Sequence, residues 1–149
     1  MDDLLVLKQA LFNEYDGFAD KRYKKLDNNK LFMIDDRSPG DYGANGQLIS
    51  SVCPMFASVE SDERVRVVLR GNVPQSQGVK KWCQKHKAKL ASKTLEFDVT
   101  PESIGMLDEL ARTIESIVAA GAYKVPSYKY VCPRVANSLR RLAKVLRSL

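Results

Sequence analysis

Apolar and polar residues alternate along two stretches of the chain, and this alternation predicts two β-strands. From Arg64 to Arg70, valine and leucine occupy every second position, between three arginines and one valine. This period of two is typical of a strand with one buried face. Residues 94–99 alternate in the same way, with Leu95, Phe97 and Val99 on one face. The short apolar run Leu31 to Ile34 fits a third strand, although a run of this length also fits a buried helical turn.

Four other stretches carry apolar residues at spacings of three and four, which predicts helices. The first begins at Asp2 or Asp3 and ends near Leu26, and the second runs from Ser76 or Gly78 to Ser92. The third begins at Thr100-Pro101-Glu102, because a capping threonine, a proline and an acid favour a helix start, and it ends near Gly121. The fourth runs from Pro133 to Leu149.

Turn-forming residues separate these elements. Asp27-Asn28-Asn29 predicts a turn, and the proline and glycines of residues 36–47 predict a loop. Residues 48–59 are apolar but ambiguous, because Pro54 argues against a central strand. Residues 64–99 read as strand, helix and strand, which is long enough for a right-handed crossover between parallel neighbours.

The order of these elements predicts the fold class. We expect a single α+β domain over residues 1–149. It would hold a small mixed sheet of about three to five strands, an N-terminal helix, a βαβ crossover and two C-terminal helices. A hydrophobic content of 44% with 28% charged residues excludes wholesale disorder.

Charge is distributed unevenly along the chain. The net charge of +6 combines −3 over residues 1–60, from 7 cations and 10 acids, with +9 over residues 61–149, from 17 and 8. Glu115 is the last acidic residue, and seven cations follow it: Lys124, Lys129, Arg134, Arg140, Arg141, Lys144 and Arg147. This asymmetry indicates an acidic or polyanionic partner for the second half.

The C-terminal helix carries part of this charge opposite an apolar stripe. Its apolar residues are Val135, Leu139, Leu142, Leu146 and Leu149. Two interpretations of the cationic face stay open. A solvated surface with cations that favour the helix dipole explains it, and so does a nucleic-acid contact, because Tyr123, Tyr128 and Tyr130 interleave with lysines just before the helix.

The second helix and the first clear strand add further cations. The helix carries Lys80, Lys81, Lys85, Lys87 and Lys89 around its polar circumference. Arg64, Arg66 and Arg70 share one face of their strand, where they suit a groove along a phosphate backbone. Ion pairing of these arginines with Glu96 and Asp98 on the other strand is an equal alternative.

These patterns predict a non-catalytic nucleic-acid-binding accessory protein that contacts phosphates, as a subunit of a larger complex. RNA and DNA stay equally open. The predicted binding residues are Arg64, Arg66, Lys80, Lys81, Lys85, Lys124, Tyr128, Lys129, Tyr130, Arg134, Arg140, Arg141, Lys144 and Arg147. A protein–protein adaptor that docks its C-terminal helix on an acidic partner is the alternative.

Candidate catalytic and metal-binding groups give weaker patterns. Cys53, Cys83, His86 and Cys132 match a zinc ligand set in number and type but lack paired CxxC spacing. Asp35, Asp36 and Asp41 suit a Mg²⁺-dependent nuclease, although turn formation explains them as well. A thiol–imidazole nucleophile and a phosphate-binding loop at residues 71–78 are weaker still. We therefore assign no cofactor, metal or catalytic residue.

Location is the last expectation from sequence. Leu4 to Leu7 are interrupted by Lys8, unlike a signal peptide, and no apolar stretch approaches the roughly 20 residues of a membrane span. Three cysteines without framework spacing favour a reducing compartment. We expect a cytoplasmic protein without a membrane partner.

Overall fold

The computed structural model describes residues 23–26, 31–34, 55–61, 64–70, 73–92, 94–126 and 128–147. They form an α+β fold, which confirms the predicted class. The strands in chain order are β1 (Tyr23–Leu26), β2 (Leu31–Ile34), β3 (Met55–Ser61), β4 (Arg64–Arg70), β5 (Lys89–Leu90) and β6 (Thr94–Val99). The helices are α3 (Gln77–His86), α4 (Gly105–Ala119) and α5 (Tyr128–Arg147).

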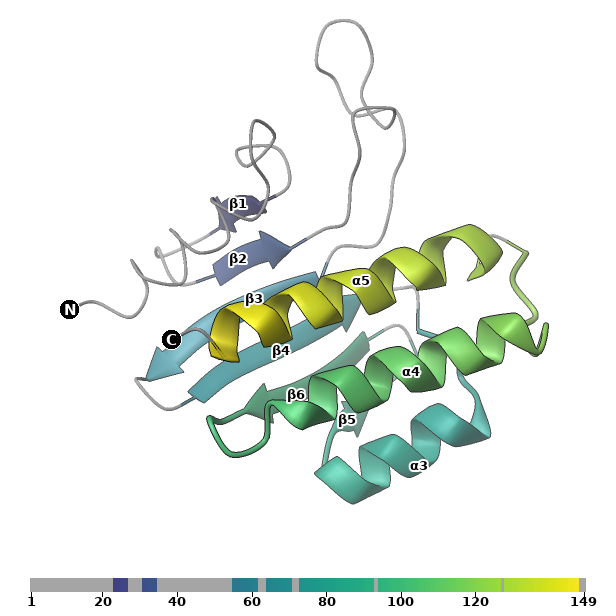
Figure 1. Ribbon diagram of the computed structural model, residues 1–149, viewed down its shortest axis with the longest axis horizontal. Helices are drawn as coiled ribbons and strands as arrows, with labels where there is room; N and C mark the ends of the chain where they lie inside the picture. Colours follow the sequence, from purple (N-terminus) through teal and green to yellow (C-terminus); the bar gives the residue numbers. More distant parts are fainter. Residues whose placement is uncertain are drawn as a thin grey trace, which may run out of the picture.

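The strands build one sheet in the order β1-β2-β3-β4-β6-β5, and every neighbouring pair is antiparallel. The predicted mixed sheet of three to five strands is therefore wrong in both respects, since six antiparallel strands are described. The three described helices lie side by side over one face of this sheet, with α4 between α5 and α3 (Figure 1).

The predicted parallel crossover between β4 and β6 is also corrected. These strands are antiparallel neighbours, with Val67 opposite Phe97. The two-residue strand β5 intervenes after α3, pairs with β6 and reverses the chain direction before β6 begins. Because β6 is inserted between them, β4 and β5 run parallel without touching, which is a split βαβ arrangement.

The end of the predicted N-terminal helix is a strand instead. Tyr23–Leu26 pairs with Leu31–Ile34 as an antiparallel hairpin, in which Leu26 lies opposite Leu31. Cross-strand pairing thus overrides the helical spacing of the apolar residues here. The rest of that helix, the turn at residues 27–29 and the loop at 36–47 lie outside the described residues. Met55–Ser61 assigns the described part of the ambiguous stretch to a strand.

The hydrophobic core lies between the sheet and the helices. Val65, Val67 and Leu69 of β4 are buried opposite Val99, Phe97 and Leu95 of β6, as the alternation predicts. Leu110 and Ile114 of α4 meet the same core, as do Leu139 and Leu142 of α5, and all four are fully buried. Leu139 and Leu142 are therefore interior and cannot dock an adaptor's partner, whereas Leu146 on the same edge is partly buried.

Helix α3 is tied to both of its neighbours by Trp82. Its indole N–H donates to the Met106 carbonyl at the start of α4, at 3.1 Å. Its ring packs edge-on against Phe97 of β6, with 5.0 Å between ring centroids. At the helix start, the Ser76 hydroxyl accepts a hydrogen bond from the Val79 amide at 3.2 Å, which is an N-cap contact. These contacts fix which face of α3 points outward.

Two helix starts differ from prediction. Thr100 does not cap α4, because residues 100–103 form a turn in which the Ser103 hydroxyl accepts from the Thr100 amide at 2.9 Å. The helix begins at Gly105 instead. Helix α5 begins at Tyr128, so Pro133 lies inside it. The early part of α5 therefore contains Tyr128 and Tyr130, which the sequence placed before the helix.

Candidate nucleic-acid interface

Arg66 of β4 is held by carboxylates on the neighbouring strand. The register places Arg66 directly opposite Asp98, and its guanidinium lies 2.7 Å from Glu96 and 3.8 Å from Asp98. The ion-pair alternative is therefore what the structure shows for Arg66. Arg64, at the start of the strand, is exposed, and the side chain of Arg70 lies outside the described part.

Two cations of α5 are held by carboxylates on α4. Arg140 donates two hydrogen bonds to Glu115, one of them at 2.7 Å, and Arg147 donates to Asp108. The hydrogen bonds from Arg140 lower the pKa of Glu115, against the opposing effect of burial. The same hydrogen bonds raise the pKa of Arg140. The cationic face of α5 is thus partly neutralised by its neighbour in the fold.

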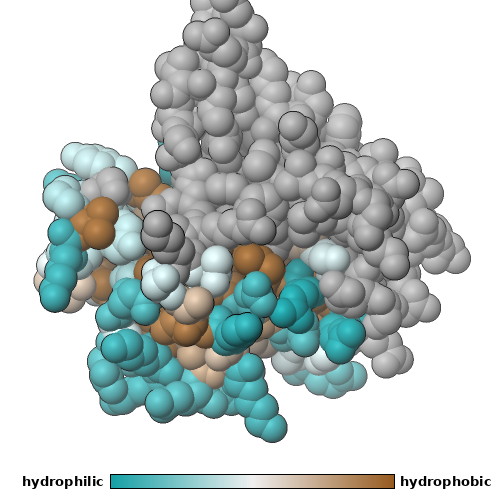
Figure 2. Space-filling model, turned by 180° about the vertical axis from the view of Figure 1, so that it is seen from behind, coloured by the Kyte–Doolittle hydropathy of each residue, from teal (hydrophilic) through white to brown (hydrophobic). Residues whose placement is uncertain are grey.

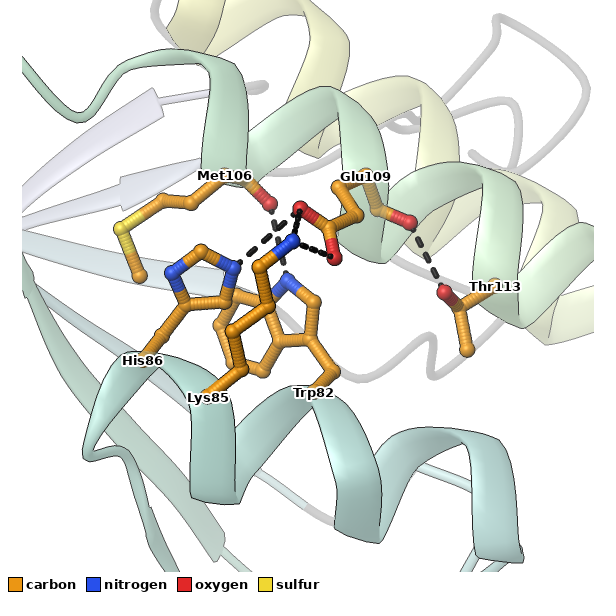
Figure 3. A network of polar contacts seen from close by, with 6 residues as sticks. All are labelled: Trp82, Lys85, His86, Met106, Glu109 and Thr113. Carbon is orange, nitrogen blue, oxygen red and sulfur yellow. Dashed lines mark hydrogen bonds and ion pairs between the residues drawn. The ribbon is translucent and has the colours of Figure 1, made fainter.

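Lys85 of α3 is engaged by a third carboxylate of α4 (Figure 3). Its ammonium lies 3.0 and 3.2 Å from the two oxygens of Glu109, and His86 Nε2 lies 3.2 Å from one of them. Burial raises the pKa of Glu109, but hydrogen bonds from Lys85 and His86 and their charges outweigh it and lower that pKa. Since His86 also packs on Trp82, this cluster joins α3 to α4.

The other two lysines of α3, and the lysine at its C-cap, are exposed. Lys80, Lys81 and Lys87, here called the α3 lysine face, are all exposed. In the described part of the chain they make no ion pair. Gln77 and Gln84 are the exposed polar residues beside them, and no acidic residue occurs between Glu63 and Glu96. Figure 2 shows hydrophilic residues gathered at the lower left, over α3 and β5.

Lys87 adds a backbone observation to this face. It has φ of 56°, and it is the one non-glycine residue with positive φ among those the structure describes. Glycine and asparagine adopt this conformation at least cost. Lys87 was not among the predicted binding residues. The sequence from Arg64 to Leu95 contains no acidic residue, and this stretch around Lys87 was the signal that would have identified it.

Predicted binding residues also lie in the connection between α4 and α5 and in the first turn of α5. Lys124 is exposed, and Tyr128 is half-buried against the core. Tyr130 is 71% exposed, and the Lys129 ammonium lies 5.8 Å from the centroid of its ring. Aromatic and cationic groups are therefore adjacent here, as the sequence predicted, but at the far end of α5 from Arg147.

Further along α5, the predicted cations do not form one free surface. Arg134 and Arg141 are half-buried and Lys144 is exposed. Each of the three makes contacts within the fold. The predicted residues therefore separate into a set held by the fold, a set on α3, the α4–α5 connection and the first turn of α5, and Arg64, which is exposed on β4.

The predicted thiol and metal groups do not converge where they are described. Cys83 and Cys132 are buried free thiols, and burial raises the pKa of Cys83, which disfavours its nucleophilic thiolate. No group of three His, Cys, Asp or Glu side chains within the described ranges is arranged to hold a metal ion. Cys53, Asp35, Asp36 and Asp41 lie outside the described residues. No described helix is both long and apolar enough to cross a bilayer.

The Glu115–Arg140 pair predicts a pH dependence of stability. The pKa of Glu115 is lower in the folded state, so its stabilising effect is present above the unfolded pKa of about 4.3 and is lost as pH falls through the folded pKa. Both side chains are about two-fifths exposed. Solvent screening therefore limits the expected loss in Glu115→Gln to at most about 1 kcal/mol of unfolding free energy at pH 7.

Urea denaturation of the wild type and Glu115→Gln between pH 7 and pH 3 measures this effect. The difference should shrink below pH about 4 and disappear at lower pH. A difference that stays constant over this range would show that the ion pair does not contribute.

The candidate interface consists of the α3 lysine face together with the connection between α4 and α5 and the first turn of α5. Ion pairs inside the fold engage the cations Arg66, Lys85, Arg140 and Arg147.

Comparisons of the chain with protein-family models, with curated proteins and with solved structures found no match.

Proposed function

We propose that this protein binds single-stranded nucleic acid through phosphate contacts, without catalysing a reaction, as an accessory part of a larger assembly. The observation that carries the proposal is the α3 lysine face, whose three exposed cations make no ion pair among the described residues. A solvated helix face normally mixes both charge signs. Lysine side chains that pair with phosphates displace the counterions condensed on the nucleic acid, and this release drives the binding.

The ion pairs support the assignment of binding to α3 rather than to the C-terminal part of α5. A guanidinium that is already bonded to a carboxylate must give up that contact before it pairs with a phosphate. It therefore contributes less free energy to binding than an unpaired cation does. Arg140 and Arg147 are in this position, whereas Lys80, Lys81 and Lys87 are not. The buried reduced thiols Cys83 and Cys132 suit a reducing compartment, and we propose a cytoplasmic location.

Lysines also suit a non-specific partner. The ammonium group is a compact point charge on a flexible stem and does not read a base edge in a fixed geometry as arginine does. We therefore propose contact with the backbone, with little dependence on base sequence.

A salt series with two matched variants tests this assignment. Fluorescence anisotropy of labelled 15-nucleotide dT and rU should show log K falling with log salt, by about 0.7 per phosphate contact. The triple variant Lys80→Gln/Lys81→Gln/Lys87→Gln should lower the slope by about 2 and weaken binding at low salt. The control Lys85→Gln/Arg140→Gln/Arg147→Gln removes the same charge and should retain most of the slope.

Three results would contradict the proposal. Absence of binding by the wild type at low salt would remove it. Equal losses in the two triple variants would assign binding to net charge rather than to the α3 lysine face. Equal affinity for poly-glutamate of the same charge would favour an acidic protein partner.

We expect the substitution Lys87→Gly to raise stability and to weaken binding. Because the positive φ of Lys87 is strained for a side-chain-bearing residue, Lys87→Gly should raise the free energy of unfolding by up to about 1 kcal/mol. The same change removes a cation, so it should weaken binding of 15-nucleotide dT. Urea denaturation and anisotropy measure the two effects, and unchanged affinity would exclude Lys87 from the interface.

A further inference from the structure

A cleft lies next to the start of α3. On one side it is lined by Pro74, Gln75 and Ser76, which precede α3, and on the other by residues 122–125 and Tyr128. Its volume is about 320 Å³, which is at the lower end of the range for small-molecule sites. The two segments meet at the same end of the helix layer, at the right of Figure 1.

The lining of this cleft has the chemistry of a base-binding site. Tyr123 and Tyr128 are both half-buried and place aromatic side chains in the lining. Lys124 is exposed between them, makes no ion pair among the described residues, and has no acidic neighbour in the lining. Aromatic rings stack on the faces of bases, while a lysine pairs with the phosphate of the same strand.

The wall on the α3 side is held in place by packing. A β-carbon at Gly78 would approach Thr113 Cγ2 of α4 to 3.2 Å, so the glycine allows α3 to lie close against α4. The N-cap contact of Ser76 fixes the backbone just before it. The α3 side of the cleft is therefore set by the fold before a ligand arrives, which lowers the entropy cost of binding.

The position of the cleft connects it to the proposed interface. Its Ser76 wall leads directly into α3, whose outward side carries Lys80, Lys81 and Lys87. A nucleic-acid strand that runs along these lysines reaches the cleft at the start of the helix. Only an unstacked base has a face free for the tyrosines, so the ligand must be single-stranded there.

We propose that this cleft accepts one unstacked base of a single-stranded nucleic acid. Tyr123 and Tyr128 stack on the base, and Lys124 pairs with an adjacent phosphate. The inference rests on the proposed function and extends it, because the α3 lysine face needs only phosphates whereas the cleft needs a base.

Two probes with equal charge separate the inference from the proposed function. One is a dT decamer, and the other is a decamer of abasic sites with the same phosphates. Wild-type protein should bind the dT decamer at least about fivefold more tightly in anisotropy, as expected for one stacked base. Lys124→Gln should weaken the binding of both probes, since it removes a phosphate contact.

Substitution of the tyrosines locates the stacking. Tyr123→Leu and Tyr128→Leu should each reduce the preference for dT, with little change in affinity for the abasic probe. Tyr130→Leu is the comparison outside the cleft, because Tyr130 belongs to the predicted binding residues but is exposed and does not line the cleft. Circular dichroism checks folding, and Tyr123→Leu retains the test if Tyr128→Leu unfolds, since Tyr128 packs on the core.

The outcomes are distinct. If neither decamer binds, the proposed function fails together with the inference. If both decamers bind equally, the cleft accepts no base and the inference alone fails. If Tyr130→Leu abolishes the preference while both cleft variants retain it, the stacking takes place outside the cleft and the inference is wrong.

Discussion

The carboxylates of α4 determine which cations of this protein remain free. Helix α4 lies between α3 and α5, and its acidic residues Asp108, Glu109 and Glu115 bond to cations on both sides. The bonds from Lys85, Arg140 and Arg147 join residues that are 24, 25 and 39 positions apart in sequence. These contacts hold cations of α5 and the inward edge of α3 to the fold and leave the outward lysines of α3 without a partner among the described residues.

In this arrangement, the residues that stabilise the fold are not the residues proposed to bind nucleic acid. Exposed ion pairs each contribute little to stability, because solvent screens them and ordering both side chains costs entropy. The packing of leucines and of Trp82 against the sheet has the larger effect, since it removes apolar surface from water. The lysines of the α3 lysine face take part neither in these ion pairs nor in the packing of the core. They can therefore bind a polyanion without loss of structure.

Local patterns in the sequence predicted the local structure well. The alternation in β4 and β6 identified both strands and their buried faces, because one-sided burial imposes a period of two. Short elements escaped this reasoning. Strand β5 has two residues, too few to show a period, and its absence from the prediction led to the wrong parallel crossover. Tyr23–Leu26 was assigned to a helix because it forms a strand only by pairing with Leu31–Ile34, and the residues of the segment itself do not show this pairing.

The candidate site was predicted only in part, for a related physical reason. The acid-free run after Glu115 indicated a free cationic face, but a count along the chain cannot show that Glu115 and Asp108 fold back onto Arg140 and Arg147. The cross-strand alternative for Arg66 was visible from the strand pattern, and the register confirmed it. The cleft joins residues about 50 apart in sequence, and no local motif marks it.

The central claim is that nucleic acid meets α3 and not the C-terminal end of α5. Acetylation of lysines in the free and bound protein, read by mass spectrometry, tests it at all lysines in one experiment. The account predicts that single-stranded nucleic acid protects Lys80, Lys81 and Lys87 strongly, together with Lys124, while Lys144 changes little. Strong protection of Lys144 with unchanged reactivity on α3 would contradict it.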